Sequence, residues 1–422
     1  MKNLNINDYI QQYLNAKDIH NPSGIFADLH DYPVDTIVSN TLFTKAVADI
    51  KTMLRLSSGY SMNQLKNIKN HYPDLPVNEL VTFITLQKKY KDKLQIADMW
   101  LLTDKNAQQA SSFLLAQYHG SLFRDYDSCA DLCCGIGMDL FFLSENKKKC
   151  FAVDLSEEIL RYASHNMSLY SDKGIVFMNI KAEEFQEEAD AVFVDPDRRV
   201  DDRRSINPFN MSPDLPALEK LYLRYPRIAI KLSPMLNYDQ YDFFKKGQLQ
   251  FVSEHNELKE ILFCSKELVK EDIFKKAVLL TENVTFTGSG KIKTDVSVIK
   301  QYLYEPNVAI IKAHLIEALA YELNLSKIDP HLALLSSDQK VQSPFVKCYQ
   351  VQEIMDFSIK KLNQFLNNQS ISQLDIKTRG FSETVEQFRN KVKLKKGNKK
   401  AVLFILKLAD KHYFVISDIK EK

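Results

Sequence analysis

The chain has 422 residues, of which 45% are hydrophobic and 26% are charged, and its formal net charge is +2. A chain of this length and balance forms about two to four globular domains, and its small net charge excludes a nucleic-acid-binding surface spread over the whole molecule. No apolar run approaches the roughly 20 residues of a membrane-spanning helix, and the first residues lack the pattern of a signal peptide, so we expect no membrane partner.

Residues 1–120 are predicted to form a helical N-terminal domain. Apolar residues recur at helical spacing between Leu80 and Leu86 and again between Phe113 and Tyr118. A periodic apolar stripe of this kind is typical of a helix that packs on a core. The first 100 positions contain no residues that indicate chemistry, so we expect this part to act as a cap or lid.

The periodicity changes at residue 128, where short apolar runs begin to alternate with helical stretches. The runs are Cys129–Leu132, Phe151–Val153, Ile175–Met178, Ala191–Val194 and Ile228–Leu232. This alternation predicts a Rossmann-like α/β domain over residues 121–300, with parallel strands and helices on both faces. Ser156 is the expected N-cap of the helix after the second run. The runs Leu249–Ser253 and Glu260–Cys264 predict an antiparallel hairpin that closes one sheet edge.

The rest of the chain has no internal repeats and is predicted to form a small α+β region in two parts. Residues 301–352 hold an expected helix over Val308–Leu323 and short strands. Residues 353–422 are expected to contain a helix, a strand over Leu374–Lys377, a helix over Ser382–Phe388, and two strands over Ala401–Leu408 and His412–Ile416.

A glycine turn follows the first predicted strand and is the strongest indication of a ligand site. Gly135 and Gly137 let the backbone approach a ligand, and the helix that begins at Met138 directs free N–H groups at the turn. Asp154 ends the next strand, close to the roughly 20-residue spacing of an acid that binds ribose hydroxyls. The third glycine of a dinucleotide fingerprint falls at Leu140, which favours a ligand without pyrophosphate. S-adenosylmethionine is such a ligand, and Asp131 can pair with its ammonium group.

Two acidic segments are expected at the carboxyl ends of later strands, where open α/β sheets bind ligands. Glu183, after Ala182, either accepts a hydrogen bond from an adenine amine or starts a solvated helix. Asp195-Pro196 ends a buried strand and points at the same crevice as the glycine turn.

Three cations lie near the same ends of the strands. Arg198 and Arg199 follow the Asp195-Pro196 pair and can either bind a phosphate or pair with nearby Asp residues. Lys231 ends the fifth apolar run and either lines the substrate side of the crevice or lies at the surface.

Two other patterns have competing interpretations. Cys133 and Cys134 lie beside the glycine turn, but no partner pair has the spacing of metal ligands, so no metal is expected. Six cysteines in so long a chain do not form a disulfide framework, and a reducing cytoplasm is the expected location. The basic run 389–400 alternates Lys with apolar residues; this suits either an edge strand with one charged face or a row of cations along a phosphate backbone.

The ordered motifs resemble those of class I S-adenosylmethionine-dependent methyltransferases. The residues concerned are Asp131-Leu132-Cys133-Cys134-Gly135-Ile136-Gly137, Asp154, Ala182-Glu183 and Asp195-Pro196. More narrowly, the segments 195–199, 231–235, 304–306 and 376–380 resemble bacterial methyltransferases with a ferredoxin-like segment, here 301–352, and a C-terminal THUMP-like domain, here 353–422. The resemblance covers roughly residues 105–420.

The resemblance implies a role for each of these positions. Asp131, Gly135 and Gly137 would hold the methionine end of S-adenosylmethionine, Asp154 the ribose, and Ala182-Glu183 the adenine. Cys133 and Leu155, beside these residues, complete the expected cofactor site together with Asp195. Asp195 and Pro196 would face the methyl acceptor as the catalytic residues, while Arg198, Arg199 and Lys231 would bind the substrate.

THUMP domains are associated with RNA, so the resemblance implies a transferase that methylates RNA, either tRNA or rRNA. Methyltransferases of exocyclic amines usually carry a proline and an aromatic residue after the Asp-Pro pair, whereas this chain has Asp197 and Arg198. An RNA-binding protein with an inactive methyltransferase domain is therefore an alternative. A nicotinamide-dependent oxidoreductase is a third possibility, because the same turn and acid would serve it.

Overall fold

The structure is a computed structural model. It describes residues 48–52, 62–73, 77–95, 100–170, 174–197, 199–200, 203–204, 207–288 and 292–419. The chain divides into two compact units. The first comprises Met1–Gly247 and Leu262–Asp272, and the second comprises Gln248–Ile261 and Ile273–Lys422.

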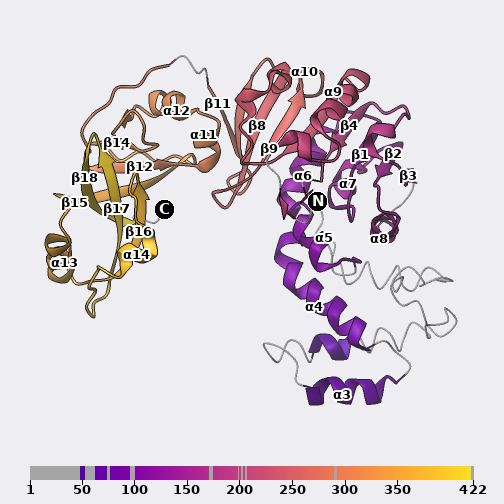
Figure 1. The fold of residues 1–422 in the computed structure, drawn as a ribbon, viewed down its shortest axis with the longest axis horizontal. Coiled ribbons are helices and arrows are strands. Elements are labelled where there is room, and N and C mark those ends of the chain that lie inside the picture. The colour runs from indigo at the N-terminus through magenta and orange to yellow at the C-terminus, as the bar shows by residue number, and fades with distance from the viewer. Residues whose placement is uncertain are drawn as a thin grey trace. The chain divides into compact units, whose positions relative to one another are not determined.

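The first unit begins with helices and continues as alternating strands and helices (Figure 1). Its helices are α3 (Met62–His71), α4 (Val77–Leu94), α5 (Asp104–Gln109), α6 (Phe113–Leu122), α7 (Met138–Leu143), α8 (Glu157–Ser168), α9 (Leu215–Arg224) and α10 (Lys266–Val269). Its strands are β1 (Ser128–Leu132), β2 (Lys149–Val153), β3 (Ile175–Met178), β4 (Ala191–Val194), β5 (Arg199–Val200), β6 (Arg203–Arg204) and β7 (Ile228–Leu232).

The predicted parallel sheet is present. Strands β3, β2, β1, β4 and β7 are neighbours in that order, and each neighbouring pair is parallel. Every residue of β4 and β7 is buried, because helices cover both faces of a sheet of this kind. Ser156 caps α8 as predicted: its hydroxyl accepts a hydrogen bond from the Ile159 N–H at 3.3 Å.

The sheet continues beyond β7 through a hairpin. Strands β8 (Gly247–Glu254) and β9 (Glu257–Ser265) are joined by His255 and Asn256, both in the left-handed region with φ of 51° and 58°. The order continues β7, β9, β8, β10 (Lys275–Leu279) and β11 (Val284–Thr287). The prediction that the hairpin closes the sheet edge is therefore wrong. The hairpin also stands where a dinucleotide dehydrogenase would have a sixth parallel strand.

The second unit contains a separate seven-stranded sheet, shown in orange and yellow in Figure 1. Its strands, in spatial order, are β13 (Ser326–Lys327), β14 (Leu335–Ser337), β12 (Tyr302–Pro306), β15 (Val346–Asp356), β18 (Lys411–Ile419), β17 (Lys399–Leu408) and β16 (Ile371–Arg379). Its helices are α11 (Val308–Lys312), α12 (Ile316–Glu322), α13 (Ile359–Asn368) and α14 (Val385–Arg389).

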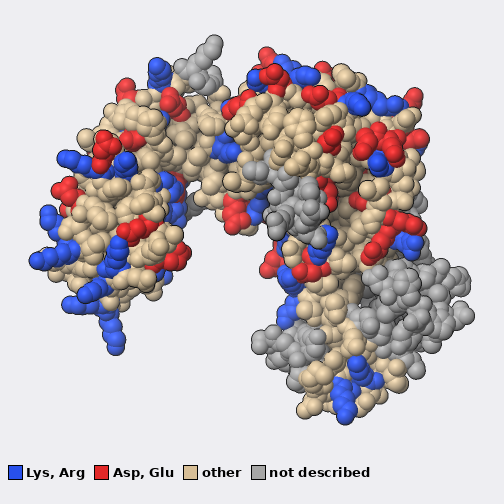
Figure 2. Space-filling model, in the orientation of Figure 1, with Lys and Arg blue, Asp and Glu red and all other residues tan. Residues whose placement is uncertain are grey.

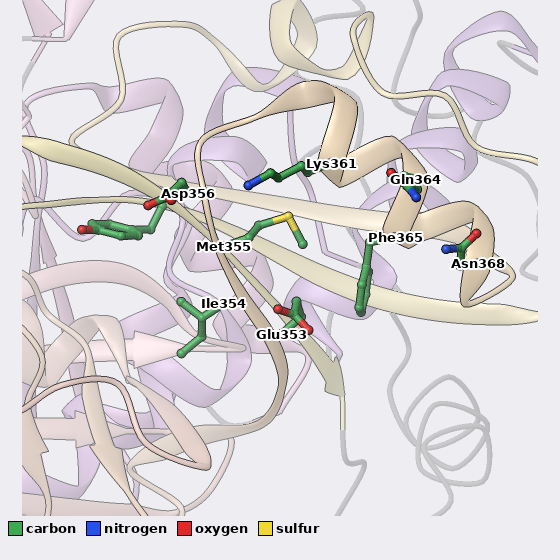
Figure 3. Close-up of a pocket in the computed structure, with 9 residues that line it drawn as sticks. Glu353, Ile354, Met355, Asp356, Lys361, Gln364, Phe365 and Asn368 are labelled. Carbon is green, nitrogen blue, oxygen red and sulfur yellow. The ribbon is translucent and has the colours of Figure 1, made fainter.

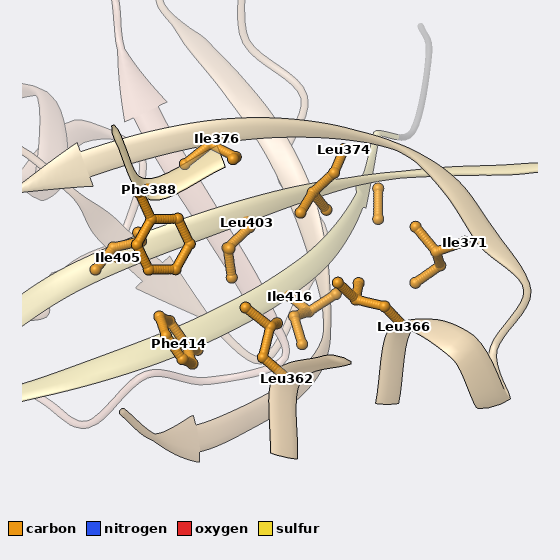
Figure 4. Close-up of a cluster of buried hydrophobic side chains, with 11 residues drawn as sticks. Leu362, Leu366, Ile371, Leu374, Ile376, Phe388, Leu403, Ile405, Phe414 and Ile416 are labelled. Atoms are coloured by element: carbon orange, nitrogen blue, oxygen red, sulfur yellow. The ribbon is translucent and has the colours of Figure 1, made fainter. Parts of the chain in front are cut away.

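An aliphatic and aromatic core fills one side of this sheet (Figure 4). Leu362 and Leu366 of α13 and Phe388 of α14 pack with Leu403 of β17 and Phe414 of the neighbouring strand β18. Burial of such side chains is the main source of stability for a small α+β unit.

Two expectations for this region need correction. The helix predicted over Val308–Leu323 is two helices, because the chain turns at His314, where φ is 58°. The basic run 389–400 is not an edge strand. Most of it is a loop, and the strand that begins at Lys399 lies between β16 and β18. Among the described residues, no helix is both long and apolar enough to cross a membrane.

Candidate functional site

The glycine turn joins β1 to α7 and folds over the end of β2. The N–H groups of Cys133 and Cys134 both donate to the Val153 carbonyl oxygen, at 2.8 and 3.0 Å. Cys133, Gly135 and Gly137 all have positive φ, of 68°, 55° and 91°. A Cβ on Gly135 would meet nothing within 4 Å. The turn therefore presents bare backbone to an open space, as the sequence predicts for a ligand-binding loop.

Asn166 of α8 holds this turn from behind. Its side-chain nitrogen donates to the carbonyl oxygens of Ile136 and Leu101, at 2.9 and 3.1 Å, and its side-chain oxygen accepts from the Leu101 N–H at 2.7 Å. Asn166 is fully buried. A buried amide with three hydrogen bonds fixes the backbone it touches, so the turn is preorganised.

Asp131 is the most unusual residue at the site. It is 1% exposed, and neither carboxylate oxygen has a hydrogen-bond partner among the residues that the structure describes. Burial raises its pKa well above the usual range, and the neighbouring Asp139 and Asp195 raise it further. A buried acceptor without a donor is costly, which indicates that a ligand group supplies the missing partner.

Asp154 follows β2 on the opposite side of the turn. Its carboxylate accepts hydrogen bonds from the N–H groups of Gly135 and Ser156, at 3.1 and 2.9 Å. Burial raises its pKa, and these two hydrogen bonds offset part of the rise. Next to it, the Leu155 side chain is 64% exposed, an unusual position for a leucine. Asp154 and Leu155 thus offer an acid and an apolar surface side by side.

The segment after β3 forms one turn of 3-10 helix, Ala182–Glu184. Ala182 is buried and Glu183 is exposed. The predicted helix start is therefore present, with the Glu183 carboxylate in solvent.

Asp195 and Pro196 follow β4, next to the tip of β1. The Asp195 N–H donates to the Leu132 carbonyl oxygen at 3.1 Å, and Pro196 is buried. Two residues on, the backbone of Asp197 exchanges two hydrogen bonds with Ser212, at 2.9 and 2.8 Å. This motif is thus held at both ends. Arg198 lies outside the described residues, and so does the side chain of Arg199.

Lys231 does not lie at the surface. It is 7% exposed, and its ammonium nitrogen lies 2.6 Å from an Asp195 carboxylate oxygen. Lys231 is the penultimate residue of β7, the strand beside β4, and Asp195 directly follows β4. The two side chains therefore come from the ends of adjacent strands. One of the two expectations for Lys231, a surface lysine, is wrong.

Three residues that the sequence motifs do not include continue from Lys231. Lys231 also donates to the Ser111 hydroxyl at 3.2 Å, which in turn donates to Asp139 at 2.8 Å. The second oxygen of Asp139 lies 2.7 Å from Nδ1 of His119. Burial tends to raise the pKa of Asp139, but the charge and hydrogen bond of His119 outweigh this and lower it.

Gly120 brings these residues together. A Cβ at this position would lie 2.6 Å from the Phe142 Cβ, so only glycine lets α6 approach α7 this closely. The His119 ring then packs 4.7 Å from the Phe193 ring, measured between centroids. The hydrogen-bonded partners in the series from Asp195 to His119 lie between 20 and 120 positions apart in the sequence, so no local motif indicates them.

The residues present fit S-adenosylmethionine. An unpartnered buried acid, an acid beside an exposed leucine, and a glycine turn that opens onto empty space are all at the same edge of the sheet. By contrast, among the residues that the structure describes, no group of three or more His, Cys, Asp and Glu side chains is arranged to hold a metal ion.

The second unit holds a separate cavity of about 570 Å³, which the sequence did not predict (Figure 3). It lies between β15, β18 and α13. Ile354, Met355 and Phe365 contribute apolar surface, and Glu353 and Asp356 contribute carboxylates. None of the predicted site residues lines it.

Two family models match the second unit. A ferredoxin-like domain model matches residues 302–344, and a THUMP domain-like model matches residues 346–418. Strands β12, β13 and β14 fall in the first range and β15 to β18 in the second, so the two matched segments share one sheet.

Most of the chain is also similar to proteins that are named as methyltransferases. It is 23% identical over 305 residues to an uncharacterized S-adenosylmethionine-dependent methyltransferase of Mycobacterium tuberculosis, a match that covers 72% of this chain and 84% of that protein. The crystal structure of a putative methyltransferase from Porphyromonas gingivalis W83 superimposes with a TM-score of 0.68 and 25% identity, over 89% of this chain and 99% of that one. These matches confirm the sequence-based prediction of an S-adenosylmethionine-dependent methyltransferase with ferredoxin-like and THUMP-like segments.

Proposed function

We propose that this protein transfers a methyl group from S-adenosylmethionine to a nucleobase of RNA, either tRNA or rRNA. The observation that carries the proposal is the arrangement of residues at the tips of the neighbouring strands β1, β2 and β4. There, the unpartnered carboxylate of Asp131 and the open space at Gly135 lie beside the Asp195-Pro196 motif.

The cofactor would be held by residues on the two sides of the turn. Asp131 would accept hydrogen bonds from the ammonium group, and the backbone at Cys133, Gly135 and Gly137 would follow the methionine end. Asp154 would bind the ribose hydroxyls with the lone pairs that its two backbone hydrogen bonds leave available. Leu155, Ala182 and Glu183 would contact the adenine.

The chemistry requires positioning more than it requires reactive side chains. S-adenosylmethionine supplies a methyl group on a sulfonium, which an acceptor atom displaces in line. The protein has to align the acceptor and exclude water from it. Asp195 and Pro196 would do this as the catalytic residues, because the backbone is fixed before them by the bond from Asp195 to Leu132 and after them by the bonds between Asp197 and Ser212. Arg198 and Arg199 would bind a flanking phosphate.

The distribution of charge supports RNA as the substrate. Residues 346–418, the THUMP-like segment, hold 14 Lys and Arg but only 7 Asp and Glu, whereas the whole chain has a net charge of +2. The rest of the chain is therefore net negative. Figure 2 shows Lys and Arg side chains gathered over the part of the second unit that holds α13 and α14. A local basic surface of this kind is what a phosphate backbone binds.

The basic loop 390–398 is fixed in place, which favours a binding surface over a solvated tail. Asn363 of α13 donates to the Lys391 carbonyl oxygen at 3.1 Å and accepts from the Lys393 N–H at 2.7 Å. Val392, between them, packs on the core of the unit. Lys393, Lys395 and Lys396 are exposed. Their charges are thereby presented without a large cost in loop ordering.

The test is incubation of the protein with methyl-labelled S-adenosylmethionine and separate tRNA and rRNA fractions. Label in one fraction, identified by mass spectrometry of the nucleosides, is the expected result. Cofactor binding by calorimetry without label in any RNA fraction would count against RNA as the substrate. We place the protein in the cytoplasm, where its six cysteines, all free, stay reduced.

A further inference from the structure

A series of hydrogen bonds leads away from Asp195 into the interior of the first unit. Cofactor binding in the proposed function does not require it. The series runs from Asp195 through Lys231 and Ser111 to Asp139 and His119. Four of its five members are less than one tenth exposed: Lys231, Ser111, Asp139 and His119. Burying polar groups costs free energy unless they form a hydrogen-bonded network, so this network calls for a functional explanation.

This series of hydrogen bonds fixes the ionisation state and the position of the Asp195 carboxylate. An ammonium group 2.6 Å from a carboxylate oxygen favours the ionised acid, and an ionised carboxylate only accepts hydrogen bonds. Lys231 cannot swing away easily, because Ser111 holds a second of its protons. Ser111 is held in turn, since its own proton goes to Asp139.

We infer that Lys231 is a positioning residue and that Ser111, Asp139 and His119 support it. We also infer that the methyl acceptor is an exocyclic amino group of a nucleobase. Both inferences rest on the proposed function. An acceptor-only group at the reacting position recognises an atom that carries a hydrogen. The hydrogens on aromatic carbons are poor hydrogen-bond donors, and unprotonated ring nitrogens carry no hydrogen.

An exocyclic amine also needs no stronger base than the Asp195 carboxylate. Its nitrogen lone pair forms the bond to the methyl carbon, the carbon–sulfur bond breaks, and that electron pair stays on sulfur. The nitrogen then carries a positive charge and is strongly acidic, so even a weak base takes its proton. A carboxylate paired with an ammonium group is such a base. The proton would move to Asp195 and from there to solvent when the product leaves.

A ribose hydroxyl fits less well. Its oxygen is a poor nucleophile until its proton is removed, and that removal comes before or during attack. A carboxylate paired with Lys231 is too weak a base to assist it strongly. The geometry therefore favours methylation of a base over methylation of ribose.

The first experiment identifies the product. The full-length protein is incubated with methyl-labelled S-adenosylmethionine and total bacterial tRNA and rRNA, and labelled nucleosides are assigned by mass spectrometry. The expected product is a nucleoside methylated on an exocyclic amine. A 2′-O-methyl, ring-nitrogen or carbon-methylated product would overturn the inference; a ring-nitrogen or carbon-methylated base would leave the proposed function standing. No label in any RNA would count against both.

The second experiment separates positioning from folding. Lys231→Met is expected to lower kcat about 100-fold, the cost of misplacing a reacting group, with little change in cofactor affinity measured by calorimetry. Lys231→Arg keeps the charge and is expected to recover part of the activity. Lys327→Met is the matched control: Lys327 is also buried and ion-paired, but it lies in β13. Its kcat should be unchanged.

A milder variant covers the case in which Lys231→Met does not fold. Ser111→Ala removes one link and is expected to lower kcat about 10-fold, with KM for RNA and cofactor affinity preserved. Unchanged kcat in a folded Lys231→Met, or in Ser111→Ala if Lys231→Met does not fold, would overturn the role of this series of hydrogen bonds.

Discussion

Two buried carboxylates, one in each unit, show how differently a folded protein can treat the same group. Asp131 in the first unit has no hydrogen-bond partner among the described residues. Glu305 in the second unit, 7% exposed, has three: Lys377 at 2.5 Å, Arg379 at 2.7 Å and the Tyr349 hydroxyl at 3.0 Å. The partners explain opposite pKa shifts. Burial raises the pKa of both acids, but the cations and the tyrosine lower that of Glu305 overall.

The difference separates an acid that serves the fold from one that we propose binds a ligand. Lys377 and Arg379 lie on β16 and Glu305 on β12, so the cluster ties the two family-matched segments of the second unit together. The motifs around Glu305 and Lys377 that indicated the family resemblance thus have a structural role. Asp131 accepts no hydrogen bond from the described residues, and in our proposal the ammonium group of the cofactor supplies one. Substitutions at the two acids test whether Glu305 and Asp131 differ in this way.

The largest expected effect on stability is that of Glu305→Gln. It leaves two partly buried cations side by side without their anion, and breaking a buried ion pair in this way costs about 3–5 kcal/mol. The measurement is the thermal unfolding of the full-length protein. Glu257→Gln is the control, because Glu257 pairs with Lys259 but is 74% exposed, and its loss should change the unfolding temperature little. Equal effects of the two variants would contradict the structural role of Glu305.

Asp131→Asn should act in the opposite way. Without ligand, it replaces a buried acid that has no hydrogen-bond partner among the described residues with a neutral amide, and is expected to leave the unfolding temperature unchanged or raise it. With S-adenosylmethionine, it should lose about 2–3 kcal/mol of binding free energy, the value of a hydrogen bond to a charged group. A variant that is destabilised without ligand and binds the cofactor normally would show that Asp131 belongs to the fold.

The pH dependence of stability sharpens the same point. Because the pKa of Asp131 is raised, the folded protein keeps a proton on it that the unfolded chain releases above about pH 4. Stability without ligand therefore falls as the pH rises from about 4 through the raised pKa. Unfolding scans at several pH values should show a smaller decline for Asp131→Asn than for the wild type. Parallel curves would exclude this linkage.

Asp154→Ala should weaken cofactor binding by a smaller amount, about 1–2 kcal/mol in calorimetry. Asp154 is more exposed than Asp131, and it already shares its oxygens with Gly135 and Ser156. Asp154→Asn keeps one acceptor oxygen and serves as the control, with an intermediate affinity. Equal affinity of all three proteins would remove Asp154 from the site.

The smallest effect concerns the basic loop. Replacing Lys393, Lys395 and Lys396 with Gln should change stability by less than about 0.5 kcal/mol, because all three side chains are exposed. RNA affinity should fall and depend less steeply on salt, by roughly 0.7 in log–log slope for each phosphate that the variant no longer neutralises. Replacing Lys245 and Lys246 of the first unit with Gln is the control. An unchanged salt dependence would show that the loop does not bind RNA.

Local features of the fold were predictable from the sequence. The strand–turn–helix from Ser128 to Leu143, the cap at Ser156 and the parallel strands all follow from apolar periodicity and from glycine positions over fewer than about 20 residues. The break at His314 was not predictable, because the apolar pattern continues through it and only its backbone angle ends the first helix.

Interactions between distant residues were the part that sequence reasoning could not reach. Lys231 reads as an isolated cation at the end of a strand, and nothing near it indicates Asp195 or Ser111, which are 36 and 120 positions away. The same holds for Glu305 and Lys377, which are 72 positions apart. Such pairs depend on the order of strands in a sheet, which periodicity does not specify.

The shared sheet of the second unit has a practical consequence for anyone who wishes to isolate it. A fragment that starts at residue 346, where the THUMP-like match begins, would lose β12 and leave one side of β15 with unpaired backbone groups. It would also leave Lys377 and Arg379 without their ion-pair partner Glu305. A recombinant fragment should therefore begin upstream of Tyr302, so that the two matched segments are cloned as one piece.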